Sequence, residues 1–416
     1  MTEQTTDYGA GNGLLHRRAF LKGGAIAAGS LAFAPLHADE TKPWMQAPGL
    51  GLEGYSEPSR FEADVVRQGF SNQPGTTGSG ASRTPLESLQ GSITPSALHF
   101  ERHHSGVPEI DPRQHALTIH GAVDQALRFD LETLDRYPHV TRLCFIECSG
   151  NSATLLGDQP KDLSAGHIHG LLSQSEWTGV PLSILLDEAG LKPNAGWIVA
   201  EGADAARLNR SVPLAKVMDD ALVALYQNGE RIRPQQGYPM RLLLPGYEGN
   251  MSVKWLHQVQ VTDRPALSRQ ETSKYTDLYA DGTAEVFTFP MSVKSVITTP
   301  SPGHKLIKNG LYEIRGLAWS GRGRVTQVEV SADEGQSWTK AQIDGPLLDK
   351  SAVRFRLPWR WSGGPTRLLS RAWDAQGAQP TRTQLLADRG NQFFYHYNAI
   401  QAWQVSADGG LSNAYT

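Results

Sequence analysis

The residue with the most distinctive chemistry is Cys148, which ends an apolar stretch and precedes Ser149-Gly150-Asn151. Functional side chains are common where a strand opens into a glycine-containing turn, and a thiolate is a soft ligand that suits a soft metal. One thiolate cannot hold a metal alone, and no zinc-type Cys/His spacing occurs nearby, so a cofactor would have to supply the other ligands. The alternative is an inert core residue, the usual role of a lone cysteine in an apolar strand.

The chain has one other cysteine, Cys144, which makes a disulfide a second alternative. Residues 140–148 are rich in β-branched, aromatic and aliphatic side chains and predict a strand. Four residues of strand separate two Cα atoms by roughly 13 Å, whereas a disulfide allows about 7 Å. We therefore expect two free thiols on one face of the strand.

Nitrogen-rich side chains offer a second kind of chemistry. Arg102, His103 and His104 stand together before a proline-marked turn, and such a cluster can bind an anion because arginine provides a charged, forked donor set. His167 and His169 form a candidate metal pair, although two histidines in a glycine-bounded loop are more often solvated. Taken alone, the first cluster is equally consistent with a polar loop.

A third group of candidate residues surrounds a nearly continuous apolar run at 240–245, which predicts a buried strand. Arg241 lies at the start of this strand, and a glycine-rich loop after it leads to Ser252 and Lys254. Backbone amides, a hydroxyl and two cations are the groups that a phosphate-bearing cofactor needs. The alternative is a strand and turn with solvated ends.

The elements that must position these groups predict an α+β domain. The sequence predicts a strand that ends at Gly121, a short capped helix at 130–134 and a helix at 181–189 with proline first and glycine after its end. Strands and helices mix without a regular repeat, which favours α+β architecture. Residues 39–93 are predicted to be irregular, because 71–96 are dense in Gly, Ser, Thr and Pro and lack a packed core of their own.

Beyond about residue 290 the pattern changes to short strands separated by turn signals, which predicts an immunoglobulin-like β-sandwich with no helical period. The predicted strands cover residues 312–319, 325–331, 338–343, 353–361 and 367–373.

The composition fits a globular protein of at least two domains. The chain has 416 residues, of which 39% are hydrophobic and 19% charged, and its formal net charge of -3 argues against nucleic-acid binding. Arg17 and Arg18 precede a short apolar stretch at 23–34 and the small residue Ala38, which predicts a twin-arginine signal over 1–38 and export to the periplasm. That route exports folded proteins and suits a redox cofactor inserted in the cytoplasm. No C-x-x-C-H occurs, so we expect no haem in this chain.

The order and spacing of the motifs resemble the sulfite oxidase family of molybdopterin oxidoreductases. The matching motifs are F-x-R-x-H-x-x-V-P at 100–108, C-x-G-N at 148–151, G-Y-P-x-R at 237–241, S-V-K-W-L at 252–256 and G-L-A-W-S-G-R-G at 316–323. The resemblance runs from about residue 94 to the C-terminus. It implies a molybdopterin domain over 94–289 and an immunoglobulin-like dimerisation domain over 290–416.

The same resemblance implies roles for individual residues. It makes Cys148 the protein ligand to molybdenum, with one molybdopterin per chain. It places Arg102 toward the substrate, Tyr275 beside the open face of the metal and Trp177 in the pocket lining. The residues that it implies contact molybdopterin are Phe100, Arg102, His103, His104, Asp204, Arg241, Ser252, Val253 and Lys254.

The chain departs from sulfite oxidases at positions that would carry charge. Where they have two arginines after C-x-G-N, this chain has Ser152 and Ala153, and Met251 replaces another arginine. Gln236 replaces a pterin-side histidine. Because a partly desolvated charge pair at about 4 Å is worth several kcal/mol, we expect these losses to change the substrate.

Within the family, the chain is most similar to the molybdenum subunit of sulfane dehydrogenases, through S-K-Y-T-D-L at 273–278 and Y-H-Y-N-A-I-Q-A-W-Q-V at 395–405. That resemblance implies oxidation of sulfane sulfur on a cysteine of a carrier protein, with a c-type cytochrome subunit as electron acceptor. It also implies a homodimer of this chain within a heterotetramer. Two alternatives stay open: a sulfite dehydrogenase acting on free sulfite, and a metal-free secreted binding protein of the same fold.

Overall fold

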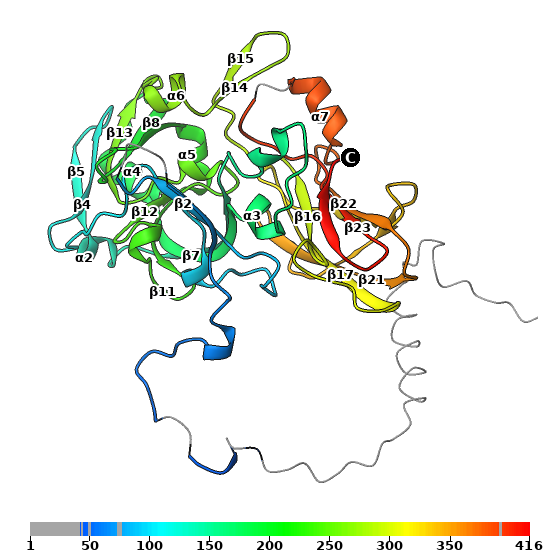
Figure 1. The fold of residues 1–416 in the computed structure, drawn as a ribbon. Helices are drawn as coiled ribbons and strands as arrows, with labels where there is room; N and C mark the ends of the chain where they lie inside the picture. Colours follow the sequence, from blue (N-terminus) through cyan, green and yellow to red (C-terminus); the bar gives the residue numbers. More distant parts are fainter. Residues whose placement is uncertain (1–41, 43–44, 49–50, 73–76, 391–392) are drawn as a thin grey trace, which may run out of the picture.

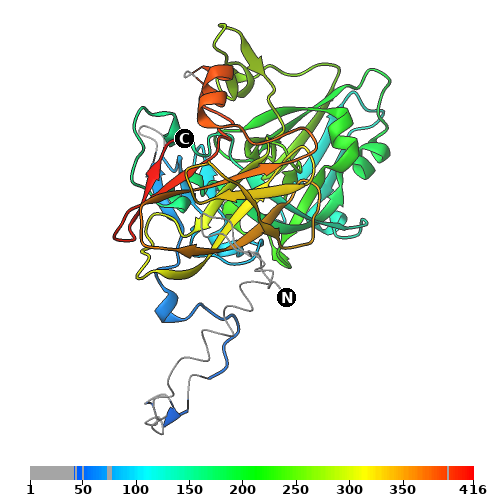
Figure 2. The ribbon, with the colours of Figure 1, turned by 90° about the vertical axis from the view of Figure 1, so that its right-hand side faces the viewer.

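The computed structural model describes residues 42, 45–48, 51–72, 77–390 and 393–416, so the predicted export signal at 1–38 lies outside the described residues. Figure 1 shows two groups of strands side by side, one built from residues 101–262 and the other from 294–414. Viewed from the side of the second group, the strands of that group lie in front (Figure 2). The short helix η2 (Arg60–Glu62) lies away from both groups.

Two five-stranded sheets form the first domain, as expected for an α+β domain. The first has the order β11-β10-β7-β6, with β12 also paired to β10. Its strands are β6 (Val140–Glu147), β7 (Leu172–Pro181), β10 (Leu222–Gln227), β11 (Glu230–Arg231) and β12 (Arg241–Leu243). The second has the order β5-β4-β13-β8-β9, in which only β4 and β13 are parallel. Its strands are β4 (Ala116–Gly121), β5 (Leu127–Asp130), β8 (Trp197–Gly202), β9 (Asn209–Pro213) and β13 (Leu256–Thr262).

Short helices connect these strands. They are α2 (Leu131–Leu134), α3 (Ala165–His169), α4 (Leu182–Ala189), α5 (Leu214–Asp220) and α6 (Arg269–Thr272). Both predicted helices are confirmed: Asp130 caps α2 by accepting from the Thr133 N–H, and Gly190 ends α4 with a φ of 72°. Helix α4 buries Leu182, Leu185 and Leu186 on one face, so helical spacing of apolar residues fixes its orientation.

Strand β6 delivers the cysteines as predicted. Cys144 is 1% exposed in an apolar cluster, Cys148 lies directly beyond the strand's end, and both thiols are free. The Cys148 N–H donates to the Leu171 carbonyl at 2.9 Å, which continues the pairing with β7 past the last strand residue. Burial raises the pKa of Cys144 to about 12, so this thiol stays protonated and inert.

The expectation that residues 39–93 are irregular is wrong at residues 68–72 and 80–83. Strands β1 (Gln68–Asn72), β2 (Gly80–Arg83) and β3 (Glu101–His103) form a three-stranded sheet in that order. Leu86 is 2% exposed and packs in the hydrophobic cluster of the second domain. The segment lacks a core of its own, but it gains strand partners and a buried leucine from chain far away in the sequence.

The second domain is the predicted sandwich of two sheets. One sheet has the order β16-β17-β21-β20, with β16 (Lys294–Thr299), β17 (Gly310–Trp319), β20 (Gln342–Ile343) and β21 (Ala352–Trp361). The other has the order β19-β18-β22-β23-β24, with β18 (Gln327–Ser331), β19 (Thr339–Lys340), β22 (Thr366–Trp373), β23 (Ala402–Val405) and β24 (Leu411–Ala414). A separate hairpin joins β14 (Thr276–Leu278) to β15 (Ala284–Val286).

Two predictions for this domain are wrong. The single strand expected at 338–343 is divided between β19 and β20, which belong to different sheets, because the chain crosses between sheets at the buried Ala341. The domain also contains a helix, α7 (Arg382–Arg389), which begins at a capping box on Thr381. Its last residue, Arg389, pairs with the buried carboxylate of Asp277 in β14, a contact distant in sequence.

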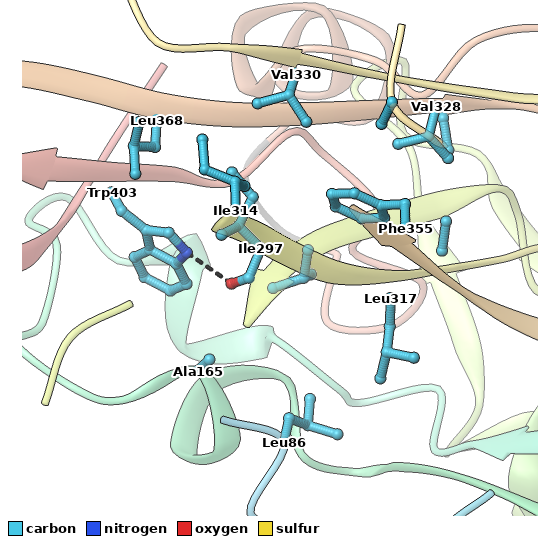
Figure 3. Close-up of a cluster of buried hydrophobic side chains, with 14 of the residues drawn as sticks. Leu86, Ala165, Ile297, Ile314, Leu317, Val328, Val330, Phe355, Leu368 and Trp403 are labelled. Carbon is cyan, nitrogen blue, oxygen red and sulfur yellow. Dashed lines mark hydrogen bonds between the residues drawn. The ribbon is translucent and has the colours of Figure 1, made fainter. Parts of the chain in front are cut away.

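The sandwich core holds Ile297, Ile314, Phe355 and Trp403, all at most 2% exposed (Figure 3). The indole N–H of Trp403 donates to the Ile297 carbonyl at 2.8 Å, so the largest of these side chains is buried without an unpaired polar atom. Leu86 and Ala165 from the first half of the chain join the same cluster (Figure 3). The two domains therefore share a continuous apolar contact.

A buried ion pair joins the domains next to Cys148. Lys294 of β16 lies 3.3 Å from Glu147, the last residue of β6, and both side chains are 1% exposed. Trp319 donates its indole N–H to the other Glu147 oxygen at 2.6 Å. Lys294 also donates to the Ser152 hydroxyl at 2.8 Å. The second domain thus forms hydrogen bonds with residues on both sides of Cys148, namely Glu147 and Ser152.

We expect Lys294→Met to destabilise the protein by about 3–5 kcal/mol, because it leaves the Glu147 carboxylate buried without its cation. The double variant Glu147→Gln/Lys294→Met should recover part of this loss, since it removes both charges. Urea unfolding of the wild type and the two variants measures the difference. A double variant less stable than Lys294→Met would contradict this account of the ion pair.

Candidate functional site

Cys148 lies at the meeting point of two cavities. Arg102, Cys148 and Tyr275 are the described residues that line both of them. In the described parts of the chain, no three His, Cys, Asp or Glu side chains gather as a metal site. A metal at Cys148 would therefore need further ligands from a cofactor.

Asn151 fixes the turn after Cys148. It is 1% exposed and donates from its amide to Glu147 and to the His169 carbonyl, both at 2.9 Å. Its amide oxygen accepts from the Leu171 N–H at 3.1 Å. The side chain of Asn151 therefore makes hydrogen bonds where the backbone pairing of β6 ends. These bonds fix the turn that places the Cys148 thiol at the edge of the sheet.

The first cavity gathers most of the residues that the resemblance assigned to molybdopterin. Eight of the nine line it: Phe100, Arg102, His103, His104, Asp204, Arg241, Ser252 and Lys254. The side chain of Val253 does not, because it is 1% exposed in the core between the two sheets. Their contacts with a cofactor stay predictions, but the fold brings four distant segments to one surface.

Lys254 organises one side of this cavity. Its ammonium donates to the carbonyls of Arg102 and Gln235, both at 3.1 Å, and to His103 Nδ1 at 2.7 Å. Burial and the neighbouring Arg241 hold the pKa of Lys254 well below its usual value. An anionic ligand bound beside Lys254 would stabilise the charged form of its ammonium, so this side of the cavity favours an anion.

Arg241 lies at the start of β12, as predicted, and is also buried in the cavity wall. It donates to the Ser252 carbonyl at 2.8 Å and to the Gln236 carbonyl at 3.1 Å. Its Nε is buried without a partner among the described residues, and burial lowers its pKa to about 9. The free N–H and the excess positive charge both fit an anionic ligand.

Trp177 does not line either cavity, contrary to the expectation from the resemblance. Its ring is fully buried, 5.1 Å from the Arg241 guanidinium and edge-on to His99 at 5.8 Å. It therefore supports Arg241 from behind. Its alternation with exposed neighbours in β7 points it inward, a direction that motif matching could not give.

Sequence reasoning missed His99, which precedes the F-x-R motif and lines the first cavity. It donates from Nδ1 to the Phe100 carbonyl at 3.0 Å, and its Nε2 is buried with no partner among the described residues. Burial lowers the pKa of His99 to about 3, so the ring is neutral at pH 7 and offers Nε2 as an acceptor. Its place next to the motif is the only sequence signal that could have identified it.

The depressed pKa of His99 predicts that acid destabilises the protein. Above pH 6.5 the ring is neutral in both states, whereas below it only the unfolded chain takes up the proton, until the folded pKa of about 3 is reached. Between pH 6.5 and pH 5 the wild type should lose about 2 kcal/mol more stability than His99→Gln. Urea unfolding at both pH values tests this, and parallel losses in the two proteins would refute it.

Tyr275 borders both cavities, as its predicted place beside the metal requires. Its hydroxyl lies 3.1 Å from His104 Nε2, and its ring faces the Arg210 guanidinium at 4.9 Å. Burial raises the pKa of Tyr275 well above its usual value, so the phenol keeps its proton. Burial also raises the pKa of Cys148, opposed by a backbone hydrogen bond from Gly150 and by Arg102, so a bound metal is what would stabilise the thiolate.

The residues that depart from sulfite oxidases lie in different surroundings. Ser152 and Ala153 line the second cavity and Gln236 the first, where its amide donates to the Phe100 carbonyl at 2.9 Å. Met251 is fully buried in the core between the sheets and faces neither cavity. Of the positions where sulfite oxidases are expected to carry arginine, Ser152 and Ala153 are therefore the two that lie at the second cavity.

The candidate metal pair of His167 and His169 does not form a pair, and neither ring is simply solvated. Both lie in α3, but His167 lines the second cavity while His169 is fully buried 2.7 Å from the Ser152 hydroxyl. Other residues of the second cavity that sequence reasoning missed include Arg83, Phe394 and Tyr395.

Known proteins with this architecture match both domains. The oxidoreductase molybdopterin binding domain matches residues 104–270, and the Mo-co oxidoreductase dimerisation domain matches residues 285–402. The crystal structure of the sulfane dehydrogenase SoxCD from Paracoccus pantotrophus matches with a TM-score of 0.88 and 44% identity, over 91% of this chain and 98% of that chain. The chain belongs to the sulfite oxidase family of molybdopterin oxidoreductases.

Other members of the family are more distant. Human mitochondrial sulfite oxidase is 31% identical over 287 residues, which are 65% of this chain and 52% of that protein. The NADH nitrate reductase of Ulva prolifera is 26% identical over 74% of this chain and 40% of that protein. The chain spans about half the length, or less, of these curated relatives.

The first cavity fits the family's molybdopterin. The unpartnered N–H of Arg241 and the cationic Lys254 suit its phosphate, and the unpartnered acceptor of His99 suits an N–H of a pterin ring. Cys148, which also lines this cavity, would supply the soft ligand for its metal. In the described parts of the chain, no helix is long and apolar enough to cross a membrane.

Proposed function

We propose that this chain is the molybdenum subunit of a sulfane dehydrogenase, which oxidises sulfur carried on a partner protein. The observation that carries the proposal is the 44% identity to the sulfane dehydrogenase SoxCD over 98% of that chain. A second observation supports it. Ser152 and Ala153 line the second cavity where sulfite oxidases are expected to carry arginines, so the wall that would face a substrate differs from theirs at two positions.

In the proposed reaction, the sulfane sulfur gains one oxygen atom from water: R–S–S⁻ + H₂O → R–S–SO⁻ + 2 H⁺ + 2 e⁻. Bound molybdenum would supply the oxygen atom and accept the two electrons. Cys148 would hold the metal between the two cavities, and Arg102 would orient the substrate. Tyr275, which keeps its proton, would donate a hydrogen bond at the metal face.

The proposal also covers the electron acceptor, the oligomeric state and the location of the enzyme. The sequence lacks C-x-x-C-H, so electrons would pass to a c-type cytochrome on another subunit. The match of residues 285–402 to a dimerisation domain supports a homodimer within a heterotetramer. The Arg17-Arg18 signal supports export to the periplasm, with the cofactor already inserted.

Two measurements test this function. Molybdenum and pterin analysis of the purified, exported protein should give about one of each per chain, whereas a metal-free protein from a host that makes the cofactor would favour the binding protein. Turnover is then compared for free sulfite and for a carrier protein bearing a cysteine persulfide, with cytochrome c reduction as the readout. We expect the persulfide to have the higher kcat/KM, and a preference for sulfite would replace the proposal with sulfite dehydrogenase.

A further inference from the structure

The second cavity has a cationic lining. Its volume is about 330 Å³, and beside Arg102 it is lined by Arg83 and His167. No Asp or Glu of the described residues lines it. Because Cys148 forms part of the wall, a substrate that reaches the metal through this cavity would meet the two arginines. The lining thus favours a substrate with an anionic group.

Arg83 comes from the N-terminal segment rather than from the matched family domain. It ends strand β2, whereas the molybdopterin domain match begins at residue 104. The neighbouring wall positions Ser152 and Ala153 are those where sulfite oxidases are expected to carry arginines. A positive charge therefore reaches the same cavity from another part of the chain.

A contact with strand β1 fixes the position of the Arg83 side chain. Its Nη1 donates to the Gly69 carbonyl, and no described residue forms a hydrogen bond with its Nε or Nη2. A side chain at position 69 would meet Arg83 Nη1 at 2.8 Å and His167 Cδ2 at 3.1 Å, and Gly69 has a φ of 55°. Glycine at this position thus lets the β1–β2 pair bring Arg83 against α3.

Arg83 and Cys148 line the same cavity, so a group bound at the metal would lie in the cavity that Arg83 borders. A guanidinium with two unpaired donor nitrogens can bind two oxygens of one sulfur oxyanion. Arg83 therefore has the charge, the free donors and the position to hold such a group.

We infer that Arg83 is a substrate-binding residue that holds the anionic sulfur group of the substrate both before and after it gains oxygen, and that it supplies the positive charge absent at Ser152 and Ala153. The inference rests on the proposed function for its substrate, a persulfide on a carrier protein whose outer sulfur gains oxygen. Arg83 touches the group that gains oxygen and takes no part in the transfer of the oxygen atom.

Inorganic sulfate is the probe for this site, because it carries the same oxygens without undergoing turnover. Isothermal titration calorimetry on the holoenzyme should show sulfate binding at least about 10-fold weaker to Arg83→Met than to the wild type. Arg83→Lys, which keeps the charge but not the fork, should fall between them. Arg60→Met is the matched control, an exposed arginine of the same segment that lines neither cavity, and should bind sulfate like the wild type.

Equal sulfate affinity in the wild type and Arg83→Met, or no binding to the wild type, would overturn the inference. With carrier-bound persulfide, Arg83→Met should raise KM about 10-fold and change kcat by less than about 3-fold. Molybdenum content and melting temperature establish that each variant is folded and loaded. Weaker sulfate binding in an enzyme that prefers free sulfite would support the role of Arg83 and reject only the carrier-bound substrate.

Discussion

Cys148→Ser should lose more than about 100-fold in activity and most of its molybdenum, because a hydroxyl replaces the soft ligand, and loss of an outer-shell partner alone costs about 10–100-fold. The melting temperature should change little in protein purified without cofactor. The measurements are metal content and carrier-persulfide oxidation in parallel preparations. An active, fully loaded Cys148→Ser protein would disprove the ligand assignment.

Cys144→Ser is the matched control, because it makes the same chemical change four residues upstream, in the strand that leads to Cys148. Cys144 lies in an apolar cluster and its thiol lines neither cavity. We expect this variant to keep its molybdenum and activity and to lose about 1–3 kcal/mol of stability, the cost of a buried hydroxyl without a partner. The contrast separates ligation from packing.

Arg102→Met should lower kcat/KM by about 100–1000-fold, the loss typical for one preorganised donor at a developing negative charge. Arg102 lines both cavities, and its charge acts on both Cys148 and Tyr275. Steady-state kinetics with carrier persulfide measures the effect, which should appear in kcat as well as in KM. Arg83→Met, by comparison, should act mainly on KM.

The matched control for Arg102 is the conservative variant Arg102→Lys, which keeps the charge and loses the fork. We expect it to recover part of the kcat lost in Arg102→Met, because one ammonium can still face the substrate. Molybdenum content must stay at the wild-type level in both variants for this comparison. A loaded Arg102→Met enzyme within about 3-fold of the wild-type kcat/KM would remove Arg102 from the mechanism.

The sequence alone determined the local elements and identified Cys148 as the candidate ligand. The apolar run at 140–148 predicted β6, and strand geometry alone showed that Cys144 and Cys148 stay free thiols. The spacing of leucines and the flanking Pro181 and Gly190 predicted α4. These features depend on periodicity and on rules that act over a few residues, so they can be read without the fold.

Only the tertiary structure decided which residues share a surface. Arg83 reaches the second cavity because β2 pairs with β3, and strand pairing between distant segments leaves no local pattern. Trp177 matches its motif yet lies behind Arg241 and not in a cavity wall. The face of the sheet to which a strand residue points depends on how its strand is paired, which a motif does not show. Helix α7 was missed although its capping box, Thr381 with Gln384, is a local signal, whereas the contact of Arg389 with the distant Asp277 could not be predicted.

The candidate site likewise combines residues that one motif places together with residues that only the fold brings together. Residues within one motif, such as Arg102 and His104, could be assigned from spacing, since the chain itself holds them together. Their shared cavity with Lys254 depends on hydrogen bonds across 151 residues of sequence, from Lys254 to His103. Short-range order is encoded in neighbouring residues, whereas long-range contacts arise from packing that buries apolar surface and pairs polar groups across the whole chain.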